Sequence, residues 1–480
     1  MTTAAIQWTA MAPILPELFL VGVAVMLIGF DLFLPRQRQL LPWMTVVGAL
    51  AALGMVLGAQ PGEGFGGMFV IDGYATIFKI ICLGAVIITT LMSEHFLRII
   101  NLRQGEYYSL LVLSLVGMLL MASAGDLMVL YLGLELMALP IYALVGLHKK
   151  DGRTSEAAIK YFLMGGFASA LLLFGLSLFY GLSGTTNIAA ISELLSSGDL
   201  VASPVFLAAL GLIIAGFSFK VAAAPFHLWT PDVYEGAPTL VTAFMSVGPK
   251  AAGFAIFGRV VFLGFADLQP HWAPVLAFMA ILTMGIGNIT ALSQTSLKRM
   301  LAYSSVAHAG YALLGLLAGT AEGMAATMTY LVVYLFMNLG AFAILMALAQ
   351  PGRRCESLED CKGLATRSPL AAALMLIFLF SLTGIPPTGG FIGKFYLLKS
   401  AFMAGYSLTV VAAVIFSAIS AYFYLRVVRY MYMDDPQEST PVVLVPGMKA
   451  ALYLCALGVL GLGFFPGSLL QWTLSALSGM

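Results

Sequence analysis

The sequence predicts an all-α, polytopic membrane protein with about 14 transmembrane helices. Three observations lead to this prediction. Of the 480 residues, 61% are hydrophobic and only 9% are charged, whereas a soluble domain carries roughly a quarter charged residues. The mean hydropathy is +0.98, and stretches of about 20 apolar residues, the length that crosses a bilayer, recur along the whole chain. A water-soluble fold of this size leaves too much surface exposed to bury so many apolar residues, so we expect lipid to surround the chain.

Apolar windows of this length place the spans in order along the chain. Their approximate bounds are 13–34, 40–58, 72–92, 107–122, 126–147, 155–181, 203–229, 238–263, 273–293, 298–318, 322–349, 368–399, 404–431 and 447–473. Glu17 and Asp31 lie within the first span and no basic residue precedes it, so we expect a retained helix and no cleaved signal peptide. Between the sixth and seventh spans, Thr186–Gly198 is expected to form a short interfacial helix on the outer side.

Lysine and arginine are divided unevenly between the loops, which predicts the orientation of the chain. Alternate loops contain nearly all the basic residues outside the spans: Arg36, Arg38, Arg98, Arg103, Lys149, Lys150, Arg153, Lys298, Arg299, Arg353, Arg354, Lys362, Arg367, Arg426, Arg429 and Lys449. Because cytoplasmic loops collect Lys and Arg, we expect these loops in the cytoplasm and both termini on the outer side. The other basic residues lie within or near the spans: Lys79, Lys160, Lys220, Lys250, Arg259, Lys394 and Lys399.

Proline and glycine interrupt two of the spans. The seventh reads FSFKVAAAPFHLWTP and the twelfth FLFSLTGIPPTGGFIGKFYLL, and such breaks are tolerated where the freed backbone faces protein or a water-filled cavity. Each broken span carries a lysine, and the breaks lie five spans apart. We therefore expect two inverted five-helix repeats, spans 4–8 and 9–13, with both broken spans discontinuous. The predicted organisation is three N-terminal helices (1–106), a first five-helix repeat (107–263), a second (273–433) and a C-terminal helix (434–480).

Three ionisable residues near the middle of the membrane indicate proton transfer. Glu135, Lys220 and Lys250 lie at similar depth in the fifth, seventh and eighth spans, too far from either surface for snorkelling. Burial favours a neutral lysine and a nearby carboxylate favours a charged one, so a movable Glu135–Lys220 pair can load and release a proton. The alternative interpretation is a static buried ion pair.

Lys394, His227 and His308 are further candidates for the same relay. Lys394 follows the IPPTGG break, where the alternative is an isolated lysine solvated by the loose backbone. His227 lies seven residues after Lys220, and His308 lies in LAYSSVAHAGYALLG. Histidine titrates near neutral pH, although a membrane histidine is often only a hydrogen-bonded packing residue.

The remaining basic residues within the spans have simpler interpretations. Lys160 has Glu156 four residues before it, so it is either a relay candidate or one half of a helix-end salt bridge. Lys79 is expected to snorkel or to contact another helix. Arg259 and Lys399 lie close to the interfaces and are expected to anchor the chain there.

Neither cofactor nor nucleic-acid binding is indicated. The net charge of +1 gives no bulk attraction to nucleic acid. The cysteines have no metal-ligand spacing, and they are Cys82, Cys355, Cys361 and Cys455. No GxGxxG or GxxxxGK loop opens a helix after a strand. We therefore expect this chain to hold no cofactor and no metal and to carry no electrons.

The segment FKVAAAPFHLWTPDVYEGAPTLVTAFMSVGPKAA, residues 219–252, resembles the antiporter-like membrane subunits of respiratory complex I. Within them, TPDVYEGAP is similar to the subunit N family, which has mitochondrial and plastid counterparts. The resemblance covers essentially the whole chain, including Glu135 and the stretch LTGIPPTGGFIGKFYL. Subunits L and M differ after the tryptophan, subunit M is expected to have glutamate in place of Lys394, and subunit L carries an extra lateral helix.

The resemblance implies a proton channel in which Glu135 pairs with Lys220, Lys250 connects the two repeats, and Lys394 is the terminal exchange site. The implied relay consists of Glu135, Lys160, Lys220, His227, Lys250, His308 and Lys394. FMN, iron–sulfur clusters and quinone would belong to partner subunits. The partners would be subunit M and small subunits such as K and J, in a bacterial inner membrane with both termini periplasmic. Asp232 and Glu235, in a cytoplasm-side loop, are expected to cap or order that loop.

The function that the resemblance implies is proton translocation as a membrane subunit of an NADH:quinone oxidoreductase. Electron transfer in other subunits would drive protons through the buried Glu/Lys/His relay. Two alternatives stay open. A subunit of a multi-subunit sodium/proton antiporter would share the fold and the lysines, although TPDVYEGAP argues against it. A structural membrane spacer would keep the same buried pairs static.

Overall fold

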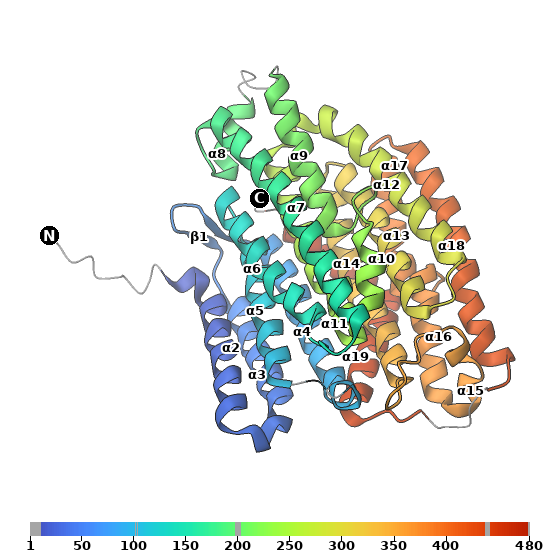
Figure 1. Cartoon of the computed structure of the whole chain (residues 1–480). Coiled ribbons are helices and arrows are strands. Elements are labelled where there is room, and N and C mark those ends of the chain that lie inside the picture. The colour runs from blue at the N-terminus through green and yellow to red at the C-terminus, as the bar shows by residue number, and fades with distance from the viewer. Residues whose placement is uncertain (1–10, 101, 103, 197–202, 437–441, 479–480) are drawn as a thin grey trace.

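The computed structural model describes residues 11–100, 102, 104–196, 203–436 and 442–478. Long helices make up most of this part of the chain and lie side by side in one bundle (Figure 1). The long helices are α2 (Leu15–Phe33), α3 (Leu41–Gly58), α4 (Gly73–Ile99), α5 (Gln104–Ala122), α6 (Leu127–Val145), α7 (Gly152–Ser183), α9 (Pro204–Val221), α11 (Thr239–Arg259), α12 (Gln269–Leu292), α13 (Leu297–Leu317), α14 (Ala321–Ala347), α16 (Pro369–Thr383), α17 (Gly389–Met403), α18 (Ser407–Met433) and α19 (Pro446–Phe464). The all-α membrane architecture is confirmed.

Short elements connect the long helices. They are the 3₁₀ turns η1 (Ala12–Ile14), η2 (Pro35–Leu40), η4 (Ala266–Leu268) and η5 (Glu359–Cys361), the π-helical turn η3 (Val260–Gly264), the strands β1 (Gly62–Gly64) and β2 (Phe69–Ile71), and the helices α8 (Ile188–Ser196), α10 (Trp229–Gly236), α15 (Leu364–Arg367) and α20 (Pro466–Ser475). The short helix expected at 186–198 is α8. The end of that expected segment, Gly198, lies outside the described residues, as does the predicted loop residue Arg103. The antiparallel hairpin of β1 and β2 was not predicted.

The number of spans agrees with the prediction. Among the described residues, 13 helices are long and apolar enough to cross a membrane, one for each predicted span except the twelfth. The twelfth is the pair of half-length helices α16 and α17, which meet at the IPPTGG break as expected. The seventh span also ends early, since α9 stops at Val221 and α10 begins only at Trp229.

The predicted fourteenth span, 447–473, is too long. The helix α19 ends at Phe464 and a separate helix, α20, begins at Pro466. The residue before a proline is biased away from helical geometry, and Phe465 adopts φ −125° and ψ 60°. Hydropathy alone did not register this break, because apolar residues continue through it.

The centre of the bundle is formed by α11, α13 and α14, and α4 and α5 pack beside them. The most apolar stretch of α11 is fully buried, whereas α2, α18 and α19 bury only about a third of theirs or less. Close helix contacts depend on small residues, as at Gly117 on α5, where an added Cβ would lie 2.2 Å from the backbone nitrogen of Met137 on α6. Polar side chains in the middle of the central helices, such as Lys250, His308 and Asn338, are buried.

Buried ion pairs join the N-terminal helices to the rest of the bundle. Lys79 on α4 donates to Glu17 on α2 at 2.7 Å, and both side chains are buried, so Lys79 makes an interhelix contact. The prediction that Arg259 anchors at the interface is wrong, because it is buried and pairs with Asp72 at 2.9 Å. Its partner is 187 positions away, which no local pattern indicates. Lys399 is exposed, as an interfacial anchor requires.

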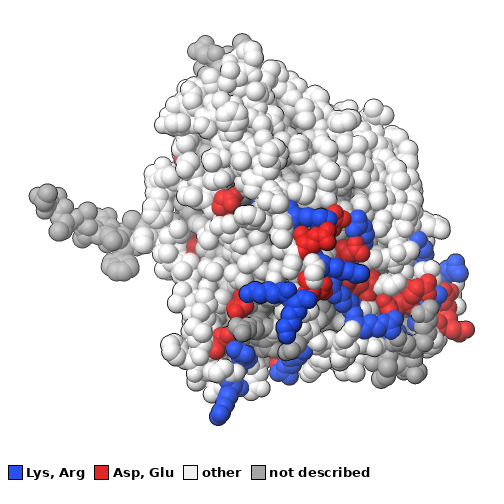
Figure 2. Space-filling model, in the orientation of Figure 1, with Lys and Arg blue, Asp and Glu red and all other residues white. Residues whose placement is uncertain are grey.

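Charged residues are unevenly distributed over the surface. Figure 2 shows Lys, Arg, Asp and Glu in a band across the lower half of the face in view, whereas the upper part around α8 and α9 is almost free of them. The sides of the bundle are covered by exposed apolar side chains such as Phe167 on α7 and Leu408 on α18. This is the surface of a helix bundle surrounded by lipid or by other membrane helices.

Candidate functional site

Three lysines in the middle of the bundle form the core of the candidate site. Lys220 on α9, Lys250 on α11 and Lys394 on α17 expose only 6%, 3% and 5% of their surface. A buried ammonium is costly unless it is paired or hydrogen-bonded. The three lysines meet this requirement in different ways.

The first helix break surrounds Lys220. Ala222, which caps α9, adopts a left-handed conformation with φ 61°. Neighbouring groups then satisfy the freed backbone: Trp229 Nε1 donates to the Phe219 carbonyl at 3.0 Å, and the Ala224 amide donates to Thr283 Oγ1 at 2.8 Å. The break is thus a fixed turn that places Lys220 in the protein interior.

Among the described residues, Lys220 Nζ has no hydrogen-bond partner, and neither has the buried Oε1 of Glu135 on α6. No ion pair within 4.0 Å joins the two in the described part of the chain. The two residues that were predicted to pair are therefore apart in this structure, each with an unused hydrogen-bonding atom. His227 lies in the same break and is buried, and its Nδ1 also has no partner.

Lys250 is held by the neighbouring helix α13. Its ammonium donates to the carbonyl oxygen of Ser305 at 2.6 Å and to the Ser305 hydroxyl at 2.5 Å. Lys250 is one helical turn before Gly253, where an added Cβ would lie 3.6 Å from the Cβ of Lys220. Lys250 thus connects the region of the first break to α13.

Helix α13 carries a polar stripe, which we define as Ser304, His308 and Tyr311. These residues recur at i, i+4 and i+7, so they share one face of the helix. His308 hydrogen-bonds through Nδ1 to the hydroxyl of Tyr330 on α14 and through Nε2 to that of Tyr424 on α18, the latter at 3.1 Å. The Tyr424 hydroxyl also lies 2.5 Å from Ser304 Oγ.

The polar stripe leads to Lys394. The ammonium of Lys394 lies 4.7 Å from the ring centre of Tyr311. At the second helix break it donates to the carbonyls of Leu382 and Thr383, at 3.0 and 2.9 Å, and to Ser417 Oγ at 3.1 Å. Carbonyls at the end of a half-helix carry partial negative charge, so this break itself stabilises the lysine.

Sequence reasoning missed the tyrosines of this network. Tyr330 and Tyr424 are fully enclosed and both bond to His308, yet they come from helices almost 100 residues apart. Tyrosine is common in membrane helices at many positions, so neither residue carried a local signal. A fully buried hydroxyl usually requires a partner, and only the fold shows which one.

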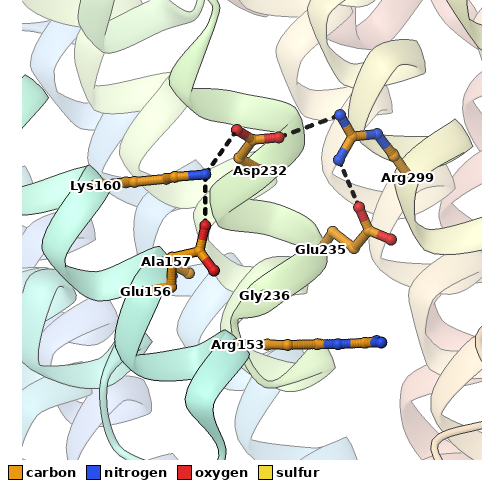
Figure 3. Close-up of a pocket in the computed structure, with 8 residues that line it drawn as sticks. All are labelled: Arg153, Glu156, Ala157, Lys160, Asp232, Glu235, Gly236 and Arg299. Atoms are coloured by element: carbon orange, nitrogen blue, oxygen red, sulfur yellow. Dashed lines mark hydrogen bonds and ion pairs between the residues drawn. The ribbon is translucent and has the colours of Figure 1, made fainter.

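We define the buried axis as Glu135, Lys220, Lys250, the polar stripe and Lys394. Lys160 does not belong to it, because it lies at the surface. Figure 3 shows it between Glu156 and Asp232, to which it makes ion pairs of 2.8 and 3.3 Å. Arg299 on α13 bridges Asp232 at 3.2 Å and Glu235 at 2.5 Å. Asp232 and Glu235 belong to the helix α10 and not to a loop as expected, because the chain resumes helical geometry at Trp229.

These charged residues line an open cavity of about 280 Å³ between α7, α10 and α13 (Figure 3). The cavity contains both signs of charge, and Lys160 exposes 44% of its side chain. Charged groups that line an open cavity on the flank of the bundle can hold water there.

The arrangement suits proton transfer. Lysine, histidine, serine and tyrosine each donate or accept hydrogen bonds. Between Lys250 on α11 and Lys394 on α17, polar side chains follow one another along α13. Among the described residues, no group of three or more His, Cys, Asp or Glu side chains could hold a metal ion. The chemistry that these residues offer is the movement of protons.

Comparisons with known proteins agree with this reading. A family described as NADH:quinone oxidoreductase/Mrp antiporter, TM, matches residues 124–420, which contain every residue of the buried axis. Subunit N of NADH-quinone oxidoreductase from Desulfovibrio desulfuricans is 56% identical over 478 residues, covering 95% of each chain. Subunit N 2 from Rhizobium meliloti is 44% identical over 474 residues, covering 98% of each.

The fold leads to the same group of proteins. A chain of respiratory complex I from Thermus thermophilus, solved with bound aureothin, superposes with a TM-score of 0.81 at 35% identity, over 95% of this chain and 98% of that chain. Sequence and fold thus agree over nearly the whole length. The chain belongs to the family of subunit N of NADH-quinone oxidoreductase, a membrane subunit of respiratory complex I.

Proposed function

We propose that this chain conducts protons along Glu135, Lys220, Lys250 and Lys394 in a membrane-bound NADH:quinone oxidoreductase. The observation that carries the proposal is the run of polar residues on α13, in which Ser305 binds Lys250 and the adjacent polar stripe leads to Lys394. His308 is the titratable group of that stripe. Electron transfer in other subunits would supply the energy.

Glu135 and Lys220 form the movable part of the relay. Each has a buried atom without a partner, and leaving such an atom unsatisfied costs about 1–3 kcal/mol. A small shift of α6 toward the break would bring the two together and favour the charged lysine. Their separation would favour release of the proton toward Lys250. The pair can thus respond to the position of a neighbouring subunit.

His227 and Lys160 have supporting roles in the proposal. The free Nδ1 of His227 is available to a water molecule inside the first break. Lys160 lies at the mouth of the charged cavity, where it can take up protons from water. No hydrogen-bonded path joins Lys160 to the buried axis in the described residues, so a path between them requires water.

The face of α6 that carries Glu135 is the expected contact with a neighbouring subunit. Met128, Leu132 and Leu139 are exposed at helical spacing around Glu135, which is partly exposed itself. A carboxylate on a lipid-facing surface at this depth would be costly. We infer that another membrane subunit covers this face, with subunits M, K and J as the candidates.

We further infer that the basic loops lie in the cytoplasm and both termini in the periplasm of a bacterial inner membrane. The two antiporter-like repeats correspond to α5–α11 and α12–α18, and each contains one break with a lysine beside it. FMN, iron–sulfur clusters and quinone are assigned to partner subunits. The sodium/proton antiporter alternative is not favoured, because the relatives of highest identity named above are subunit N.

The relay is tested by replacing its lysines in the assembled complex. In inverted membrane vesicles, Lys220→Ala and Lys394→Ala should lower the number of protons moved per NADH oxidised. Lys150→Ala, at an exposed loop residue, serves as the control and should match the wild type. Unchanged proton movement in both axis variants, with assembly intact, would favour the spacer interpretation. Dependence on sodium ions would favour the antiporter alternative.

A further inference from the structure

A basic cavity lies at one end of the N-terminal helices and shares no residue with the relay. Arg36, Arg38 and Gln39 of η2 line it together with Arg98 and Leu102 at the end of α4, and its volume is about 270 Å³. It opens on the surface at the turn between α2 and α3. Figure 2 shows basic side chains at the lower edge of the molecule, below the α2–α3 hairpin of Figure 1.

The cavity has unused capacity to bind negative charge. Arg38 Nε donates to Asp31 at 2.6 Å, and Arg98 Nη2 donates to Glu94 at 2.6 Å. Arg36 makes no hydrogen bond or ion pair with any described residue. The three guanidinium groups of the cavity therefore have only two carboxylate partners, and both carboxylates are already paired. Each guanidinium keeps free N–H donors that can bind phosphate oxygens in pairs.

Large apolar side chains flank the arginines on the outside of the bundle. Phe33 and Leu32 at the end of α2 expose 84% and 70% of their surface, and Trp43 at the start of α3 exposes 55%. A tryptophan beside arginines at the end of a membrane helix is typical of the level of the lipid headgroups. Exposed apolar residues continue along both helices, including Val25 and Val47. The surface thus offers a path for acyl chains directly beside the cavity.

We propose that this cavity binds the headgroup of an anionic phospholipid, such as phosphatidylglycerol, with its acyl chains along α2 and α3. The phosphate diester would accept hydrogen bonds from Arg36 and Arg98. A zwitterionic lipid fits less well, because its ammonium group would find Asp31 and Glu94 already occupied. A free phosphate would use only the arginines and would gain nothing from Phe33 and Trp43. Basic pockets between membrane helices are known to select anionic lipids.

Lipid retention by the purified complex tests the proposal. The complex is stripped of lipid in detergent, and the binding of phosphatidylglycerol, phosphatidylcholine and glycerol phosphate is measured by native mass spectrometry. Arg36→Gln should weaken phosphatidylglycerol binding about fivefold and Arg36→Gln/Arg98→Gln about 30-fold, from the usual contribution of one arginine near a charged membrane surface. Arg36→Gln breaks no contact within the described chain, so misfolding is not expected to explain its effect. Arg429→Gln, an exposed arginine outside the cavity, is the matched control.

Several results would overturn the proposal. Equal binding of phosphatidylcholine would show that the negative charge is not recognised. Equal competition by glycerol phosphate would show a simple phosphate site without lipid. Unchanged binding in the double variant would place the lipid elsewhere. Failure of a soluble maleimide to label Arg36→Cys in the intact complex would show that a neighbouring subunit covers the cavity.

Discussion

The buried lysines of this chain differ in what compensates their charge. Lys79 has a carboxylate partner, and Lys394 has two backbone carbonyls and a hydroxyl. Lys220 has no hydrogen-bond partner among the described residues. An ion pair with a carboxylate favours a permanent charge, whereas neutral oxygens or an absent partner leave the protonation state open to change. This difference distinguishes Lys79 from the two lysines of the proposed relay, although all are buried to a similar degree.

Removing one partner of the ion pair between Lys79 and Glu17 should lower the stability of the protein, and removing both partners should restore most of it. Glu17→Ala leaves a buried ammonium without its partner, which typically costs about 3–5 kcal/mol. Glu17→Leu combined with Lys79→Met removes both charges and should recover most of that loss. The thermal midpoint of the purified complex, followed by scanning fluorimetry, measures both effects.

The matched control for this pair is Glu94→Ala, which breaks an exposed i, i+4 pair with Arg98. Such pairs contribute about 0.3–0.5 kcal/mol, so the thermal midpoint should hardly change. If Glu17→Ala and Glu94→Ala lowered the midpoint equally, the buried pair would not be the connection between α2 and α4 that its geometry indicates.

The tyrosine partners of His308 should affect proton movement more than stability. Tyr424→Phe removes one hydroxyl that bonds both His308 and Ser304. Losing such a bond costs about 1 kcal/mol, so we expect proton movement to slow about fivefold if this link limits the rate. The rate of acidification in inverted vesicles measures the effect.

Tyr422→Phe is the control for this variant, because Tyr422 is two residues away on α18 and exposed to the outside of the bundle. It should behave as the wild type. Loss of assembly in Tyr424→Phe alone would assign the hydroxyl a structural role, and an unchanged rate would exclude it from the relay.

At the level of single elements, the two helix breaks explain why the lysines can be buried. A continuous helix bonds its own carbonyls, whereas a broken one frees them inside the membrane. The ends of α16 and α9 illustrate two outcomes: α16 gives its carbonyls to Lys394, and α9 gives one to Trp229. The second break therefore supplies a lysine site directly, and the first leaves Lys220 free for Glu135.

Gly384 at the second break should be sensitive to an added methyl group. It caps α16 with φ 90°, and its Cβ would lie 3.1 Å from Cδ of Lys394. Gly384→Ala should cost about 1–2 kcal/mol from the left-handed backbone alone and should displace the lysine from its carbonyls. We expect fewer protons moved per NADH oxidised, together with a lower thermal midpoint.

Gly461→Ala on α19 is the matched control, since nothing lies within 4 Å of the Cβ that the substitution adds. Within a helix this change should stabilise by up to about 1 kcal/mol. If both alanine variants moved protons like the wild type, the geometry of the second break would not control Lys394.

These elements also show what sequence can and cannot predict. Hydropathy predicts the spans, and Pro and Gly predict the two breaks, because both signals are local. The break at Phe465 was missed since the apolar run continues through it. The ion pair of Arg259 with Asp72 and the contacts of His308 with Tyr330 and Tyr424 depend on helices that meet only in the fold.

At the scale of the whole molecule, charge is segregated between the two ends of the bundle. The connection after α14, which contains Arg354 and Lys362, lies at one end. The hairpin with Glu63 and the turn with Asp267 follow helix ends on the other side. This alternation depends on the number of spans, because omitting one helix would move every later loop to the opposite end of the bundle. The distribution of basic residues and the number of spans therefore support each other.

Labelling of single cysteines tests the orientation that follows from this segregation. Glu63→Cys, in the exposed hairpin, should react with a membrane-impermeant maleimide in intact spheroplasts, and Lys150→Cys should not. In inverted vesicles the two should exchange behaviour. The native cysteines are Cys82, Cys355, Cys361 and Cys455, all of them buried, so the background should be low. Labelling of both variants from the same side would contradict the number of spans between them. A reversed pattern would place the basic loops in the periplasm, contrary to the rule that positive charge stays in the cytoplasm.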